Sequence, residues 1–117
     1  MATGNDFRAL EAGAHAFAAR DGHYRALTTM HFDRQTRVLH ASLTLPLAVG
    51  VVGGNCGWHR GVKVAQKILG SFAYSSEKLA SVMVSVGLAQ CLAALFALSS
   101  EGIQKGHMRL HNKKLIK

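Results

Sequence analysis

The residues of this chain that could carry chemistry are few and lie far apart. Asp6 follows Thr3-Gly4-Asn5, and His107 and His111 lie four residues apart in the C-terminal part of the sequence. A carboxylate can hold and orient a neighbouring cation, and a histidine can donate a proton near neutral pH. Each also has an ordinary structural interpretation, because Asp6 can cap a helix and an isolated histidine commonly lies on a surface or in a core.

The sequence has no pattern typical of a metal centre or a phosphate-binding loop. His107 and His111 could face one ion from the same side of a helix, but no third ligand accompanies them. Cys56 and Cys91 do not have the spacing of metal ligands, and the N-terminus lacks a charged-then-apolar targeting pattern. We therefore expect no metal site and a reduced, cytoplasmic chain.

Length and composition indicate a single globular unit with a basic surface. The chain has 117 residues, of which 49% are hydrophobic and 17% charged, and its formal net charge is +8. This charge would suit nucleic acid, an anionic membrane or a phosphorylated ligand. The basic residues crowd the C-terminus without the interleaved aromatic residues that a surface for single strands needs. They are Lys105, Arg109, Lys113, Lys114 and Lys117.

Helices and one hairpin must position these residues. Asp6 can cap a first helix, and Pro46, which cannot donate to a ladder, suggests that the second strand ends or lies at an edge. Gly70 is a suitable C-terminal cap, and Ser75 or Ser76 can start the longest helix. The expected elements are a helix over 7–20, a hairpin of strands over 26–32 and 38–47, and helices over 62–69 and 77–99.

The helix expected over 77–99 is apolar on every side. No charged residue occurs between Lys78 and Glu101, and the 20 residues from Leu79 to Leu98 could span a bilayer by length. Serine, glycine and glutamine dilute this segment, and no aromatic belt flanks it. A helix that is apolar all round is also typical of one buried inside a larger protein, which is the interpretation we favour.

Three blocks of this sequence resemble class II, bacterial-type 3-hydroxy-3-methylglutaryl-CoA (HMG-CoA) reductases, in the order of that family. The most specific block contains Gly-Leu-Ala-Gln at 87–90 and Glu-Gly-Ile-Gln-Lys-Gly-His-Met at 101–108. Thr-Gly-Asn-Asp at 3–6 with the following Glu-Ala-Gly-Ala-His, and Leu-Thr-Leu-Pro-Leu at 43–47 with the following glycines, support it. The departures lie at 55–60, at Cys91, where asparagine is usual, and at Phe96, which replaces a commonly basic residue.

The resemblance implies roles for individual residues. Asp6 matches the aspartate that fixes the charge and position of a catalytic lysine, and His107 matches the histidine that protonates the departing CoA thiolate. His111 has a weaker claim to a catalytic role than His107. Four further positions match those that line the HMG-CoA pocket, although plain helix core is an equal interpretation for the three apolar ones. They are Gln90, Ala94, Leu98 and Ile103.

The resemblance also implies the fold and the domain organisation. We expect an α+β fold, a fragment of the large, substrate-binding domain of HMG-CoA reductase with about four helices plus a β-hairpin. Residues 1–117 would form part of that domain. The catalytic glutamate, the catalytic lysine and the nicotinamide-binding domain of the family lie upstream of Gly4, and most of the C-terminal flap lies beyond His111, so these parts are expected to be absent.

The activity that the resemblance implies is the NAD(P)H-dependent reductive deacylation of HMG-CoA to mevalonate and CoA, or the reverse, in the complete enzyme. The expected partners are these substrates, NAD or NADP bound outside this chain, and further copies in a dimer-based homo-oligomer, with no nucleic acid and no membrane. The chain alone is expected to be incomplete and inactive. The alternatives are an inactive truncated gene product, or a small basic protein associated with nucleic acid or a membrane.

Overall fold

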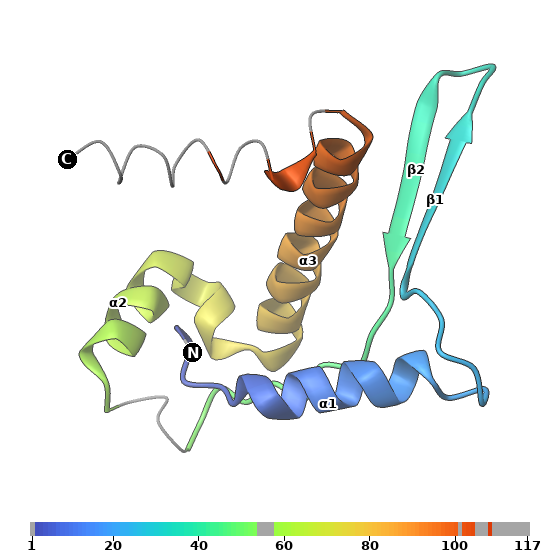
Figure 1. The fold of residues 1–117 in the computed structure, drawn as a ribbon. Coiled ribbons are helices and arrows are strands. Elements are labelled where there is room, and N and C mark those ends of the chain that lie inside the picture. The colour runs from blue at the N-terminus through green and yellow to red at the C-terminus, as the bar shows by residue number, and fades with distance from the viewer. Residues whose placement is uncertain (1, 54–57, 101, 105–107, 109–117) are drawn as a thin grey trace.

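The chain folds into a set of helices, and one β-hairpin projects to the side of them (Figure 1). A computed structural model describes residues 2–53, 58–100, 102–104 and 108 (Figure 1). Within these residues the fold class is α+β, as predicted, with three α-helices and one 3₁₀ helix in place of about four helices. The elements in chain order are α1 (Phe7–Ala18), β1 (Thr28–Asp33), β2 (Val38–Leu43), α2 (Arg60–Leu69), the 3₁₀ helix η1 (Gly70–Tyr74) and α3 (Ser76–Ser99).

Helix α1 begins at the predicted cap and ends two residues early. Asp6 has extended backbone angles, φ −77° and ψ 105°, and its side chain accepts a hydrogen bond from the Arg8 N–H. That bond satisfies one of the backbone donors that the first turn of a helix leaves unpaired. At the other end Ala19 leaves the helical region, its N–H donates to the His15 carbonyl and the Arg20 N–H donates to the Phe17 carbonyl, so the helix closes at Ala18 instead of Arg20.

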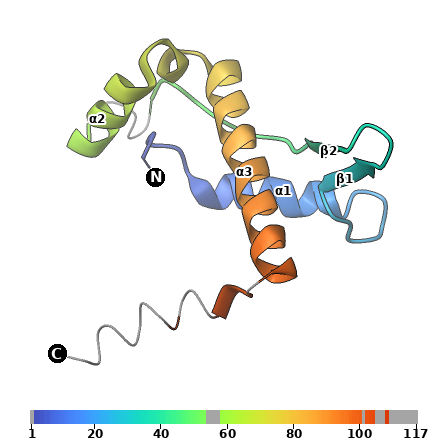
Figure 2. The same cartoon turned by 90° about the horizontal axis from the view of Figure 1, so that it is seen from above.

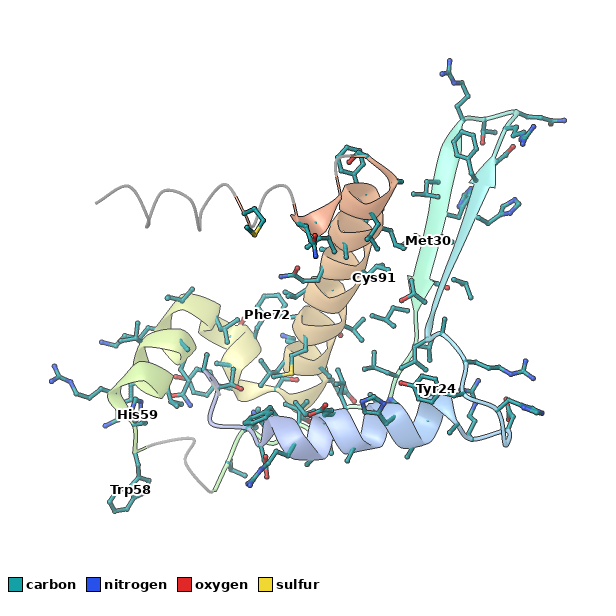
Figure 3. All side chains as sticks on the ribbon, in the orientation of Figure 1. Tyr24, Met30, Trp58, His59, Phe72 and Cys91 are labelled. Carbon is teal, nitrogen blue, oxygen red and sulfur yellow. The ribbon has the colours of Figure 1, made fainter. Side chains whose placement is uncertain are left out.

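The hairpin pairs β1 with β2 in an antiparallel register that runs from Thr28 opposite Leu43 to Asp33 opposite Val38. Because side chains alternate along a strand, one face of the hairpin is apolar. A Cβ atom on Gly87 would lie 3.3 Å from Leu43 Cδ2, so the base of this face rests against the α3 backbone. Met30 points to the same side, toward α3 (Figure 3). Strand β2 ends at Leu43 instead of residue 47 because β1 begins at its partner, Thr28.

Helix α2, η1 and α3 form a corner. Gly70 ends α2 with a positive φ of 56°, a conformation that favours glycine. The Ser75 hydroxyl then accepts the Lys78 N–H and starts α3, as predicted. The 3₁₀ helix between them contacts both α-helices. Each of the three elements contributes one buried apolar residue: Val62 from α2, Ala73 from η1 and Leu79 from α3.

Helix α3 presents most of its apolar surface to solvent. It stands over α1 and crosses it when the molecule is seen from above (Figure 2). By length and composition it could cross a membrane, since its most apolar window has a mean hydropathy of 2.0, and only 6% of that window is buried. Phe96 is 71% exposed and Leu98 63% exposed. Such a surface needs a cover of protein or lipid.

Candidate active site

A pocket of about 690 Å³ opens where α1 and α2 begin. Its walls come from the segment that leads into α1, from the first residues of α1 and from the start of α2. Two helix N-termini therefore meet at one pocket, although about fifty residues separate them along the chain. The lining residues are Ala2, Gly4, Asn5, Asp6, Phe7, Arg8, His59, Gly61 and Val62.

Asn5 joins two of the sequence blocks at this pocket. Its Oδ1 accepts a hydrogen bond of 2.8 Å from the Gly50 N–H, and its Nδ2 donates to Thr3 Oγ1 at 3.0 Å. Gly4, between Thr3 and Asn5, has a φ of 80°, which a residue with a Cβ rarely adopts. The block around residues 3–6 thus lies beside the segment that follows Pro46.

Asp6 is the carboxylate of the pocket. Its Oδ1 accepts the Arg8 N–H at 3.0 Å and Arg8 Nε at 3.0 Å, and its Oδ2 accepts Arg8 Nη2 at 3.1 Å. The side-chain hydrogen bonds from Arg8, followed by the bond from the Arg8 N–H, lower the pKa of Asp6 below its ordinary value of 3.8. The same pairing raises the pKa of Arg8. Asp6 is therefore an anion, and Arg8 a cation, throughout the neutral range.

His59 also lines the pocket and caps α2. Its Nδ1 accepts the Gly61 N–H at 3.1 Å, so the neutral ring carries its proton on Nε2. A Cβ on Gly61 would lie 3.1 Å from the same Nδ1, which makes the close approach dependent on glycine. Figure 3 shows His59 at the start of α2, next to Trp58. The role of His59 was not predicted from the sequence, because histidine is not a usual capping residue.

The other residues predicted for the site lie elsewhere or outside the description. Gln90, Ala94 and Leu98 follow one another at intervals of four residues, so they share one face of α3, and all three are exposed. Ile103, 48% exposed, follows α3 after Gly102. These four residues do not line the pocket beside Asp6. His107 lies outside the described residues.

Within the part of the chain that the structure describes, no group of three or more histidine, cysteine, aspartate or glutamate residues could hold a metal ion. The ionisable side chains that line the pocket are one carboxylate, one guanidinium and one imidazole, those of Asp6, Arg8 and His59. Such a set can bind and orient a charged partner.

Comparisons with known proteins identify the family. The sequence profile of hydroxymethylglutaryl-coenzyme A reductase matches residues 1–112. A 3-hydroxy-3-methylglutaryl-coenzyme A reductase of Archaeoglobus fulgidus is 50% identical over 115 residues, which are 98% of this chain and 26% of that protein. A probable reductase of Borreliella burgdorferi is 40% identical over 116 residues. The chain belongs to the hydroxymethylglutaryl-coenzyme A reductase family.

Solved structures narrow this assignment to class II. The class II reductase of Streptococcus pneumoniae bound to NADPH in open conformations superposes with a TM-score of 0.80 and is 48% identical; the match covers 97% of this chain and 27% of that one. A second structure of the S. pneumoniae reductase gives a TM-score of 0.81. The chain thus spans about a quarter of the length of the relatives that it matches.

Proposed function

We propose that this chain forms part of the substrate-binding domain of a class II HMG-CoA reductase and contributes two catalytic positions, Asp6 and His107. The complete enzyme would convert HMG-CoA to mevalonate and CoA with NADH or NADPH, or run the reverse reaction. The observation that carries the proposal is the ionised Asp6 carboxylate at the pocket, held in place by Arg8.

Asp6 would act on a lysine from another part of the enzyme. Reduction of a thioester places negative charge on its carbonyl oxygen, and a nearby ammonium group stabilises that charge. A carboxylate beside the ammonium keeps it protonated and oriented. Asp6 suits this task because its pKa is lowered and its side chain is half exposed at the pocket. Its capping bond to α1 does not conflict with this role, since Oδ2 accepts only one described bond.

His107 would protonate the CoA thiolate as it leaves. A thiol has a pKa of about 8.5 and a histidine one of about 6.5, so the imidazolium is a competent donor near neutral pH. The support for this role is the Gly-His-Met sequence around His107 in a chain of this family.

One face of α3 would contact the substrate. Gln90 can hydrogen-bond a polar group, while Ala94 and Leu98 offer apolar surface on the same side of the helix. Ile103 would extend this surface past the end of α3. All four side chains are exposed in this chain, which leaves them accessible to a ligand.

The nicotinamide cofactor would supply the hydride. The glycines of this sequence form no phosphate-loop pattern, so its residues do not fit the cofactor phosphates and another part of the enzyme would bind them. The contribution of this chain is confined to binding HMG-CoA, fixing a charged lysine and moving a proton to sulfur.

A chimera tests the proposal. Residues 1–117 would replace the equivalent segment of the S. pneumoniae class II reductase, which is 48% identical. We expect the chimera to oxidise NADPH in an HMG-CoA-dependent manner. Circular dichroism and gel filtration would verify that it folds and assembles like the parent. A chimera that folds and assembles normally but shows no HMG-CoA-dependent oxidation contradicts the proposal.

A further inference from the structure

The Arg8 side chain meets Asp6 in an unusual geometry. Residues two apart in a helix do not face each other. Asp6, however, is the cap and has extended backbone angles, so its side chain turns back over the first turn of α1. There it receives three hydrogen bonds from Arg8: one from the backbone N–H, one from Nε and one from Nη2. The guanidinium therefore grips both carboxylate oxygens in a fork.

This grip leaves one oxygen with spare capacity. A carboxylate can accept about four hydrogen bonds, two at each oxygen. In the described structure Oδ1 accepts two and Oδ2 accepts one. The Asp6 side chain is 50% exposed and lines the pocket together with Arg8. A further cationic donor can thus approach Oδ2 while Arg8 prevents the carboxylate from rotating.

The ion pair between Arg8 and Asp6 is not explained well by a contribution to folding stability alone. The Arg8 side chain is 77% exposed, and exposed ion pairs contribute little to folding. The cap bond to α1 comes from the backbone N–H of residue 8, so it does not need the arginine side chain. What the guanidinium adds is the orientation of the Asp6 carboxylate, which it holds through Nε and Nη2.

We propose that Arg8 is a positioning residue that fixes the Asp6 carboxylate at the pocket and directs Oδ2 toward the ammonium group of the active site. The catalytic role of Asp6 in this inference rests on the proposed function. The hydrogen bonds by which the Arg8 side chain holds the Asp6 carboxylate do not depend on it. A lysine at position 8 would keep the charge without the fork, and a glutamine would remove both the charge and the fork.

The first experiment measures the grip directly in the 117-residue chain. The pKa of Asp6 would be followed by NMR titration of its carboxyl carbon, in a mild detergent that keeps the chain dispersed. Arg8→Gln should raise this pKa toward 3.8, and Arg8→Lys should raise it less. The matched control is Arg20→Gln. This arginine contacts Phe17 instead of Asp6, since it donates to the Phe17 carbonyl at 2.8 Å and lies over the Phe17 ring. An Asp6 pKa that is unchanged in Arg8→Gln overturns the inference.

The second experiment measures the consequence in the chimera. Arg8→Gln should lower kcat by about 10- to 100-fold with little change in KM for HMG-CoA, as is typical when a partner that orients a reacting group is lost. Arg20→Gln should leave kcat unchanged. If Asp6→Asn inactivates the chimera while Arg8→Gln keeps the full rate, Arg8 does not position Asp6. If Asp6→Asn keeps the full rate, the proposed function of Asp6 fails. The titration still decides separately whether the Arg8 side chain holds the Asp6 carboxylate.

Discussion

Replacing Asp6 with asparagine or with alanine separates the observed cap from the proposed catalytic role of this residue. Asparagine caps a helix as well as aspartate does, and its amide oxygen can accept the Arg8 N–H bond that Oδ1 accepts at 3.0 Å. Its amide nitrogen, however, is a donor and would face Arg8 Nη2, which now lies 3.1 Å from Oδ2. Asp6→Asn therefore keeps the cap and breaks the fork, whereas Asp6→Ala loses both.

The expected loss of rate follows from the missing charge. If Asp6 orients a lysine as proposed, loss of the carboxylate removes that orientation, and losing one such electrostatic contribution costs about 10²- to 10³-fold in kcat. Because Arg8 lowers the pKa of Asp6 below 3.8, the native carboxylate loses its charge only as the pH falls through that lowered value. The ratio of kcat between the native and Asp6→Asn chimeras should therefore stay constant across the neutral range.

The assay is steady-state NADPH oxidation by the chimera, together with thermal unfolding followed by circular dichroism. We expect both variants to lose kcat and only Asp6→Ala to lose thermal stability. An Asp6→Asn chimera with the full native rate would show that Asp6 is a helix cap alone. An Asp6→Asn chimera that unfolds as early as Asp6→Ala would show that its loss of rate is structural.

Three further results are expected. A polypeptide of residues 1–117 alone should not reduce HMG-CoA, because it spans only about a quarter of the length of the reductases that it matches; cofactor turnover by the purified polypeptide would refute this. The same polypeptide should self-associate in sedimentation experiments without detergent, because only 6% of the most apolar window of α3 is buried, and a monodisperse, cooperatively melting monomer would argue against it. Flotation with lipid vesicles but no self-association would instead favour membrane binding. Finally, Gly87→Val should destabilise the contact between the hairpin and α3 by about 1–3 kcal/mol, because even a Cβ there lies 3.3 Å from Leu43 Cδ2. Gly13→Ala, with open space around it, should stabilise α1 by about 0.5–1 kcal/mol in the same chemical denaturation.

The sequence predicted the elements best where a single residue signals a boundary. Ser75 starts α3 within one residue of the predicted position, and Gly70 ends α2 as predicted. Boundaries that depend on tertiary partners were less accurate. Strand β2 ends opposite Thr28, where its antiparallel partner β1 begins. Helix α2 starts two residues early because His59 acts as its cap. Neither cause is visible in the local sequence.

The candidate site was predictable only in part for a similar reason. Asp6 was found both as a cap and through the family resemblance, and the structure bears out the cap. The contribution of Arg8 was missed because helical spacing places residues 6 and 8 on different faces, a rule that fails at a cap with extended backbone. That His59 and Asp6 line the same pocket depends on the long-range fold, which no local motif encodes.

The central claim, that this chain supplies catalytic positions of an HMG-CoA reductase, is tested most directly by His107→Gln in the chimera. Glutamine keeps some hydrogen bonding but has no transferable proton. The rate with HMG-CoA should fall by about 10²- to 10⁴-fold, as expected when a general acid is lost. Reduction of free mevaldehyde releases no thiolate, so it should be largely retained, and His111→Gln should be nearly silent. Equal loss with both substrates, or sensitivity at His111 instead, would contradict the account.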